Sequence, residues 1–334
     1  MPSEEEIKEA LKEILVPGIA RSITGLNLIR EIKVNSDRMK VTLASTGLNT
    51  DTQKYVQEKA GNALEGLPGV KGIAIEFEEA KPQELNKIDH VIAVMSGKGG
   101  VGKSLVTGLL ATGLNRQGHD IGVLDADITG PSIPKMFGIT ARPGGSETGI
   151  LPVLSKSGIE IMSVNLLLPH EDDAVIWRGP LIGKMIQQFW DDVLWGKLDY
   201  LLVDLPPGTA DAPLTVMQTL PLSGVVIVFT PQDLTAMVVK KAMNMAQKMN
   251  IPILGVVENM SYLVSPDTGK RIEIFGSTNG EEMALAAGAP LLEQLPLDPE
   301  LARLCDEGTI ERYNSDGVSN LAQALLQATP VKTG

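Results

Sequence analysis

A glycine-rich segment near residue 100 carries the clearest chemical signal in the chain. Residues 97–104 read Gly-Lys-Gly-Gly-Val-Gly-Lys-Ser, which matches the phosphate-binding pattern G-x-x-x-x-G-K-[ST]. The glycines allow consecutive backbone N–H groups to point at one anion, and a following helix adds a favourable dipole. Lys103 can reach the β- and γ-phosphates of a nucleotide, and the Ser104 hydroxyl can bind Mg²⁺. The pattern predicts a nucleotide cradle built from Gly97, Lys98, Gly99, Gly100, Val101, Gly102, Lys103 and Ser104.

Three aspartates follow two later apolar runs, at places where they can serve the same phosphates. Asp125 and Asp127 come at the end of the run 121–124, and Asp204 follows the run 200–203. Ligands bind at the carboxyl ends of parallel strands, so we expect the three carboxylates to converge on the γ-phosphate and Mg²⁺. Asp204 suits the carboxylate that holds Mg²⁺ through water, and Asp125 suits a supporting position behind the direct ligands.

Polar residues after two further apolar runs are candidates for the base pocket. Asn259 follows the run 253–257, and its amide can read the donor and acceptor edge of adenine. The segment 230–233 follows the run 225–229 in the same way. Amide chemistry alone also allows guanine, but the sequence has no N-K-x-D guanine motif. The sequence therefore favours ATP as the bound nucleotide.

The elements that must position these residues alternate between strand and helix from residue 90 onward. Continuous apolar runs are typical of strands buried on both faces, and amphipathic stretches lie between most of them. This alternation predicts a doubly wound α/β fold with about seven mostly parallel strands and helices on both faces. The expected strands are 91–95, 121–124, 159–164, 200–203, 225–229 and 253–257, with helices at 104–116 and 235–249 among the connections.

The first 80 residues predict a small, separate α+β domain. Helical periodicity and turn residues predict helices at 4–15 and 50–64 and strands at 30–34, 39–44 and 70–77, with a turn at 35–37. Residues 81–89 are mostly polar and include a proline, so they predict an exposed linker that proteases can cut. The expected organisation is a domain at 1–80, a linker at 81–89 and a nucleotide-binding domain at 90–330.

The composition excludes several other classes of protein. The net charge of -12 disfavours a general nucleic-acid binder, because phosphate contacts need clustered Lys and Arg. The single cysteine, Cys305, excludes a disulfide framework and any site that needs two thiolates from one chain. No secretory signal or apolar run of membrane-spanning length is present, so we expect a cytoplasmic protein with neither membrane nor nucleic acid as partner.

The second lysine of the loop, Lys98, adds a resemblance to a known group. The segment 97–104 resembles the deviant P-loop ATPases related to MinD, ParA and the nitrogenase iron protein. The resemblance implies that Lys98 reaches across a homodimer to the phosphates of the partner's nucleotide. It also implies that Asp127 orients the attacking water, that Asn259 reads adenine and that the chain hydrolyses ATP.

Several further segments are similar to the Mrp/ApbC-type proteins, which are iron–sulfur cluster carriers and assembly factors. The resemblance covers nearly the whole chain and includes the small N-terminal domain. It implies a role in assembling iron–sulfur clusters or transferring them to apoproteins. The segments that carry it are 125–134, Trp177-Arg178-Gly179-Pro180, 198–211 and 258–262.

One departure from that family leaves the function open between alternatives. Many members carry C-x-x-C where this chain has Ser265 and Thr268, and cluster iron is normally held by thiolates. Cys305 is expected on the apolar face of a helix, so no cluster ligands are identified. The chain is predicted to be either an ATP-driven cluster carrier or an ATP-dependent scaffold that holds no cluster. A MinD- or ParA-like positioning ATPase is a third possibility, although residues 318–330 lack the basic side chains of a membrane-binding helix.

Overall fold

The computed structural model of the 334-residue chain describes residues 2–35, 38–70, 72–127, 130, 132–167, 179–232, 234–277 and 279–330. Parts of four sequence-based expectations lie outside these residues: the turn at Ser36 and Asp37, Pro131, the pair Trp177 and Arg178, and Asp233. The chain divides into two compact units. The first unit comprises Met1–Ile88, Arg142–Leu154 and Gln188–Leu198, and the second comprises Asp89–Ala141, Ser155–Gln187 and Asp199–Gly334.

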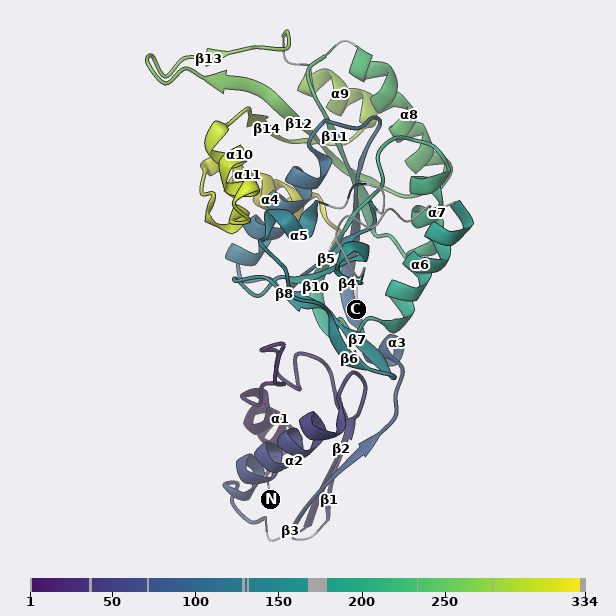
Figure 1. Cartoon of the computed structure of the whole chain (residues 1–334), viewed down its shortest axis with the longest axis vertical. Coiled ribbons are helices and arrows are strands. Elements are labelled where there is room, and N and C mark those ends of the chain that lie inside the picture. Colours follow the sequence, from purple (N-terminus) through teal and green to yellow (C-terminus); the bar gives the residue numbers. More distant parts are fainter. Residues whose placement is uncertain are drawn as a thin grey trace. The chain divides into compact units, whose positions relative to one another are not determined.

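The first unit contains a three-stranded sheet and two helices that share one core (Figure 1). The strand order is β1-β2-β3, with β1 antiparallel and β3 parallel to β2. A capping box at Ser3 starts the first helix, and the side chain of Asn49 caps the second. The elements are α1 (Glu4–Lys12), β1 (Ile29–Asn35), β2 (Arg38–Ala44), α2 (Thr50–Glu65) and β3 (Gly72–Glu78).

The first unit extends beyond the domain predicted for residues 1–80. The predicted linker instead contains α3 (Pro82–Leu85), with a proline in its first turn, and the start of β4 (Lys87–Ser96). Leu85 is buried in the core of the unit, together with Leu151 and Leu194 from later in the chain. Five of residues 81–89 are exposed, as the polarity of the segment indicated, whereas Pro82 and Leu85 are buried. The later parts of the unit include β6 (Gly144–Ser146), β7 (Gly149–Leu151) and β8 (Val153–Leu154).

The second unit is built around a mostly parallel sheet, as predicted from the sequence. Its strand order runs β13-β12-β11-β4-β10-β5-β9, and β14 pairs with β12. The pairs β11–β4, β11–β12, β12–β14, β10–β5 and β5–β9 are parallel, whereas β13 is antiparallel to β12. The strands are β5 (Ile121–Asp125), β9 (Glu160–Ser163), β10 (Lys197–Asp204), β11 (Gly224–Phe229), β12 (Ile253–Val264), β13 (Arg271–Ile272) and β14 (Leu291–Pro296).

Helices cover both sides of this sheet, with α4 and α11 on one side and α7 and α8 on the other (Figure 1). α4 is buried almost all round, and Gly113 lets α11 approach it, because a Cβ there would lie 2.9 Å from the Cβ of Ala322. None of the described helices combines the length and apolar character needed to span a bilayer. The helices are α4 (Lys103–Arg116), α5 (Ile133–Met136), α6 (Gly179–Asp192), α7 (Asp211–Thr219), α8 (Leu234–Lys248), α9 (Gly280–Ala287), α10 (Pro299–Asp306) and α11 (Asp316–Ala328), with 3₁₀ turns η1 (Val164–Leu167) and η2 (Ile310–Arg312).

Candidate nucleotide-binding site

The predicted phosphate loop connects the end of β4 to the start of α4. Gly100 and Gly102 have φ values of 80° and 81°, in the left-handed region that glycine adopts without steric cost. Gly102 is the N-cap of α4, and no side chain of the described residues caps that helix. The N–H groups of the first turn are therefore available to an anion, and the helix dipole favours one.

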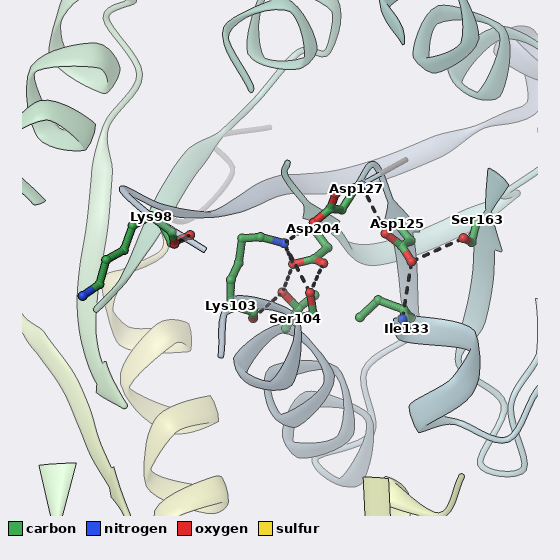
Figure 2. A network of polar contacts seen from close by, with 10 residues as sticks. Lys98, Lys103, Ser104, Asp125, Asp127, Ile133, Ser163 and Asp204 are labelled. Carbon is green, nitrogen blue, oxygen red and sulfur yellow. Dashed lines mark hydrogen bonds and ion pairs between the residues drawn. The ribbon is translucent and has the colours of Figure 1, made fainter. Parts of the chain in front are cut away.

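Lys103, Ser104 and Asp204 meet directly behind the loop (Figure 2), and Thr107 joins them. The Nζ of Lys103 lies 2.7 Å from Oδ1 of Asp204, and the hydroxyl of Ser104 donates to Oδ2 of Asp204 at 2.5 Å. The hydroxyl of Thr107 donates to Oδ1 of Asp204 at 2.9 Å. Sequence reasoning missed Thr107, although its place one helical turn after Lys103 and Ser104 puts it on the same face of α4.

The convergence of the aspartates follows from the register of the parallel strands. Asp204 of β10 is paired with Asp125 of β5, and Asp125 is in turn paired with Ser163 of β9. The last residues of three adjacent strands therefore stand side by side. This arrangement agrees with the expectation that the carboxylates gather at one edge of the sheet.

Asp125 is fully buried, and its carboxylate bonds residues outside the phosphate loop. Its carboxylate accepts hydrogen bonds from the Ser163 hydroxyl at 3.3 Å and from the N–H groups of Ile133 at 3.4 Å and Asp127 at 3.2 Å. Burial and the nearby Asp204 carboxylate raise the pKa of Asp125 to about 8, against the opposing effect of Lys103. These contacts suit a residue that shapes the loop carrying Asp127.

Asp127 lies near the same lysine, beside Asp204 (Figure 2). Its Oδ2 lies 4.0 Å from the Nζ of Lys103, and only 8% of the residue is exposed. The Lys103 ammonium therefore lies near two carboxylates, with Asp125 close by. This excess of negative charge favours a divalent cation beside the lysine.

Lys98 lies apart from this cluster and points away from Lys103 (Figure 2). Its Nζ donates to Oε1 of Gln232 at 2.9 Å, in the segment that follows β11. The two lysines of one loop thus have different surroundings.

Asn259, predicted to read adenine, lies against the phosphate loop. Its Nδ2 donates to the carbonyl oxygen of Val101 at 2.9 Å, and the residue is 1% exposed. A Cβ added at Gly102 would collide with the same amide, so this glycine is needed for space as well as for its backbone angle. Oδ1 of Asn259 is buried and has no hydrogen-bond partner among the described residues.

Ser265 and Thr268 lie at the tip of the hairpin that β12 and β13 form. Leu263 pairs with Ile272, and the N–H of Thr268 donates to the Ser265 hydroxyl at 3.4 Å. Cys305 lies on α10, half-buried, and burial together with Asp306 raises the pKa of its thiol to about 11. The residues at the hairpin tip therefore offer hydroxyl groups rather than thiolates.

The side chains at the loop fit a nucleotide phosphate and Mg²⁺. The site combines a buried ammonium, an uncapped helix N-terminus, a hydroxyl and a carboxylate, which are the groups that such a pair needs.

Comparisons with known proteins cover most of the chain and identify its family. The family model described as NUBPL iron-transfer P-loop NTPase matches residues 87–329, and the model described as iron-sulfur cluster assembly protein matches residues 4–77. The chain is 35% identical over 332 residues to an iron-sulfur cluster carrier protein of Aquifex aeolicus, covering 91% of this chain and 90% of that protein. It is 48% identical over 234 residues to the protein of the same name from Clostridium perfringens, covering 68% and 82% of the two chains.

Solved structures of nucleotide-binding proteins have a fold similar to that of this chain. A nucleotide-binding protein from Archaeoglobus fulgidus, in complex with ADP, is 45% identical and superposes with a TM-score of 0.65, covering 75% of this chain and 96% of that one. The cell division ATPase MinD of Pyrococcus furiosus is 20% identical, with a TM-score of 0.52 and coverages of 72% and 99%. The likeness to MinD supports the fold alone.

Proposed function

We propose, from the premise that this chain belongs to the iron–sulfur cluster carrier family of P-loop NTPases, that it hydrolyses Mg-ATP to drive the delivery of iron–sulfur clusters to apoproteins. The observation that carries the nucleotide chemistry is the meeting of Lys103, Ser104 and Asp204 behind an uncapped helix N-terminus. The cluster is cargo in this proposal. The evidence for this cargo is the family membership alone. The described residues supply no pair of thiolates that could hold a cluster.

The roles of the loop residues follow from their present contacts. The N–H groups of residues 97–104 and the ammonium of Lys103 would hold the phosphates, and Lys103 would exchange part of its bond to Asp204 for phosphate oxygens. Ser104 and Asp204 would then hold Mg²⁺, supported by Asp125. Bound Mg²⁺ would neutralise phosphate charge.

Asp127 is the residue we assign to orienting the attacking water. Its carboxylate lies beside the phosphate loop, with Oδ2 4.0 Å from the Nζ of Lys103, and is therefore placed to accept a hydrogen bond from a water near the phosphates. Asp125 supports this role by accepting the backbone N–H of Asp127.

We further propose that the active form is a homodimer in the cytoplasm. Lys98 points away from the Lys103 cluster of its own chain, which suits a residue that acts on a partner's nucleotide. A cytosolic iron–sulfur cluster assembly factor of Chaetomium globosum is 43% identical over 269 residues, covering 74% of this chain and 86% of that protein. Adenine recognition by Asn259 stays a prediction from the sequence, because the residue is 1% exposed and its amide bonds the Val101 carbonyl of the phosphate loop.

A second candidate function is an ATP-dependent scaffold that holds no cluster itself. The hydroxyl side chains of Ser265 and Thr268 at the hairpin tip favour it, because a hydroxyl deprotonates far less readily than a thiol. Its partners would be assembly proteins rather than a bound cluster.

Two measurements test these proposals. Calorimetric titration with Mg-ATP, followed by phosphate release, should show binding and slow hydrolysis; absence of binding would refute the nucleotide assignment. Anaerobic reconstitution with iron and sulfide, with iron counted per dimer, separates the carrier from the scaffold. Iron that binds weakly and is lost to a chelator supports the carrier, and iron-free protein that still hydrolyses ATP supports the scaffold.

A further inference from the structure

A bulge near the end of β12 brings the buried Asn259 to the phosphate loop. The pairing of β12 with β14 joins Glu258 to Gln294 and then shifts register before Tyr262. Met260, inside the bulge, has φ of 55°, in the left-handed region that non-glycine residues seldom adopt. Such a backbone persists only where the surrounding contacts fix it.

The carboxylate of Glu258 makes those contacts. It accepts from the Ser261 hydroxyl at 2.8 Å, the Gln294 amide at 2.6 Å and the N–H of Asn279 at 2.9 Å. Glu258 and Ser261 are both fully buried. One carboxylate therefore joins the two sides of the bulge to β14 and to the start of α9. Satisfied buried polar networks of this kind rigidify a segment.

Asn259 is the residue that this bulge presents to the loop. Its Nδ2 bonds the Val101 carbonyl, and its amide fills the space beside Gly102. A carbonyl held in this way fixes the peptide plane within the loop. A loop fixed before binding loses less conformational entropy when it takes up phosphates.

We propose that Asn259 is a strut that holds the phosphate loop in its binding conformation, and that Glu258 is the positioning residue that keeps this strut in place. The inference rests on the proposed nucleotide function and extends it. A residue that holds the loop affects the binding of any polyphosphate, with or without a base. A residue that contacts adenine affects binding only when the ligand carries that base. Glu258 is fully buried, so it acts through Asn259 rather than by touching a ligand.

Dissociation constants for Mg-ADP and for Mg-pyrophosphate test the strut directly. Asn259→Ala should weaken both ligands by a similar factor of about tenfold, which is the effect of losing one buried hydrogen bond. A loss confined to ADP would overturn the strut and leave Asn259 as a base reader. Wild-type protein that binds neither ligand would instead refute the underlying nucleotide function.

A double-mutant cycle tests the positioning role. Glu258→Gln puts an NH₂ group among donors, and we expect it to weaken both ligands in the wild-type background but hardly at all in Asn259→Ala. Additive losses would mean that Glu258 does not act through Asn259. Ser261→Ala, which removes one of the three donors, is the milder variant should Glu258→Gln fold poorly, and the same two outcomes apply to it.

The control is Glu300→Gln, the same chemical change on an exposed helix, where the side chain pairs with Arg303. It should leave both dissociation constants unchanged. Melting temperatures measured without ligand separate a general loss of stability from the expected loss of ligand affinity.

Discussion

At the scale of single residues, Lys103 is expected to dominate nucleotide affinity. In the wild type, the Lys103 ammonium lies 2.7 Å from the Asp204 carboxylate. Lys103→Ala removes this ammonium and leaves the buried carboxylate without a cation. Both effects disfavour phosphate, so the dissociation constant for Mg-ATP should rise by about 100-fold. Calorimetry checks this, with Lys98→Ala as the matched lysine control that should keep affinity in the monomer. Unchanged affinity in Lys103→Ala would place the phosphates elsewhere.

Asp127 should matter to hydrolysis rather than to binding. Asp127→Asn preserves the shape of a side chain that lies 4.0 Å from Lys103, but it weakens the acceptor that would orient water. We expect Mg-ATP affinity to stay within about threefold and single-turnover phosphate release to slow by about 100-fold. A wild-type rate would show that another group positions the water.

Cys305 should be a poor nucleophile at neutral pH. Burial raises the pKa of its thiol to about 11, so only about one molecule in a thousand carries a thiolate at pH 8. The alkylation rate follows the fraction of thiolate. The rate of a free thiol stops rising once the pH exceeds its pKa, whereas the rate of Cys305, whose folded-state pKa is raised, should keep rising about tenfold per pH unit. Mass spectrometry after iodoacetamide treatment between pH 7 and 10, with glutathione as reference, measures this; a plateau near pH 9 contradicts it.

At the scale of elements, the β12–β13 hairpin offers a test of cluster binding. Ser265→Cys with Thr268→Cys places two thiols at the tip, where the Thr268 N–H already bonds the Ser265 hydroxyl. After anaerobic reconstitution, the double variant should hold more iron per dimer and show thiolate–iron absorbance, whereas the wild type should show little. Cys305→Ala in the wild-type background is the control. A stable cluster in that control would mean ligands other than the chain's own thiols.

Sequence patterns predicted the elements best where one physical signal dominates. The buried parallel strands appear as apolar runs, and the phosphate loop is set by glycine and lysine spacing, so both were located within a few residues. The end of β12 was missed, because polar Asn259 and Ser261 interrupt the apolar run although both are buried. Asn259 bonds the Val101 carbonyl, and the Glu258 carboxylate that accepts from Ser261 also accepts from Gln294, so both depend on residues distant in sequence. Local pattern cannot report partners of that kind.

The same limit applies to the short elements of the first unit. α3 was interpreted as linker because four of the nine residues at 81–89 are charged, and the pair β6–β7 begins at two glycines that usually mark turns. The buried side chains that tie these segments down come from three separate stretches of the chain. At the phosphate loop, the sequence pattern pointed to the lysine, the serine and the three aspartates, whereas it did not point to Thr107 or Glu258.

At the scale of the whole molecule, Asn86 is expected to hold the first unit together across those separate stretches. Its Nδ2 donates to the Val193 carbonyl at 2.9 Å, and its Oδ1 accepts the N–H groups of Trp195 at 2.8 Å and Gly196 at 3.0 Å. One half-buried amide therefore ties α3 to residues that lie more than a hundred positions later in the chain. The segment 78–87 should consequently resist proteases, in contrast to the exposed linker indicated by its composition.

Asn86→Ala removes three hydrogen bonds and leaves two backbone N–H groups and one carbonyl without this partner. We expect it to lower the free energy of unfolding of the first unit by about 2 kcal/mol and to open residues 78–87 to limited proteolysis. Gln83→Ala, which loses one exposed bond to Asp191, is the matched control and should change little. Cleavage at 78–87 in the wild type, with the second unit intact, would restore the simpler arrangement of two domains joined by an open linker.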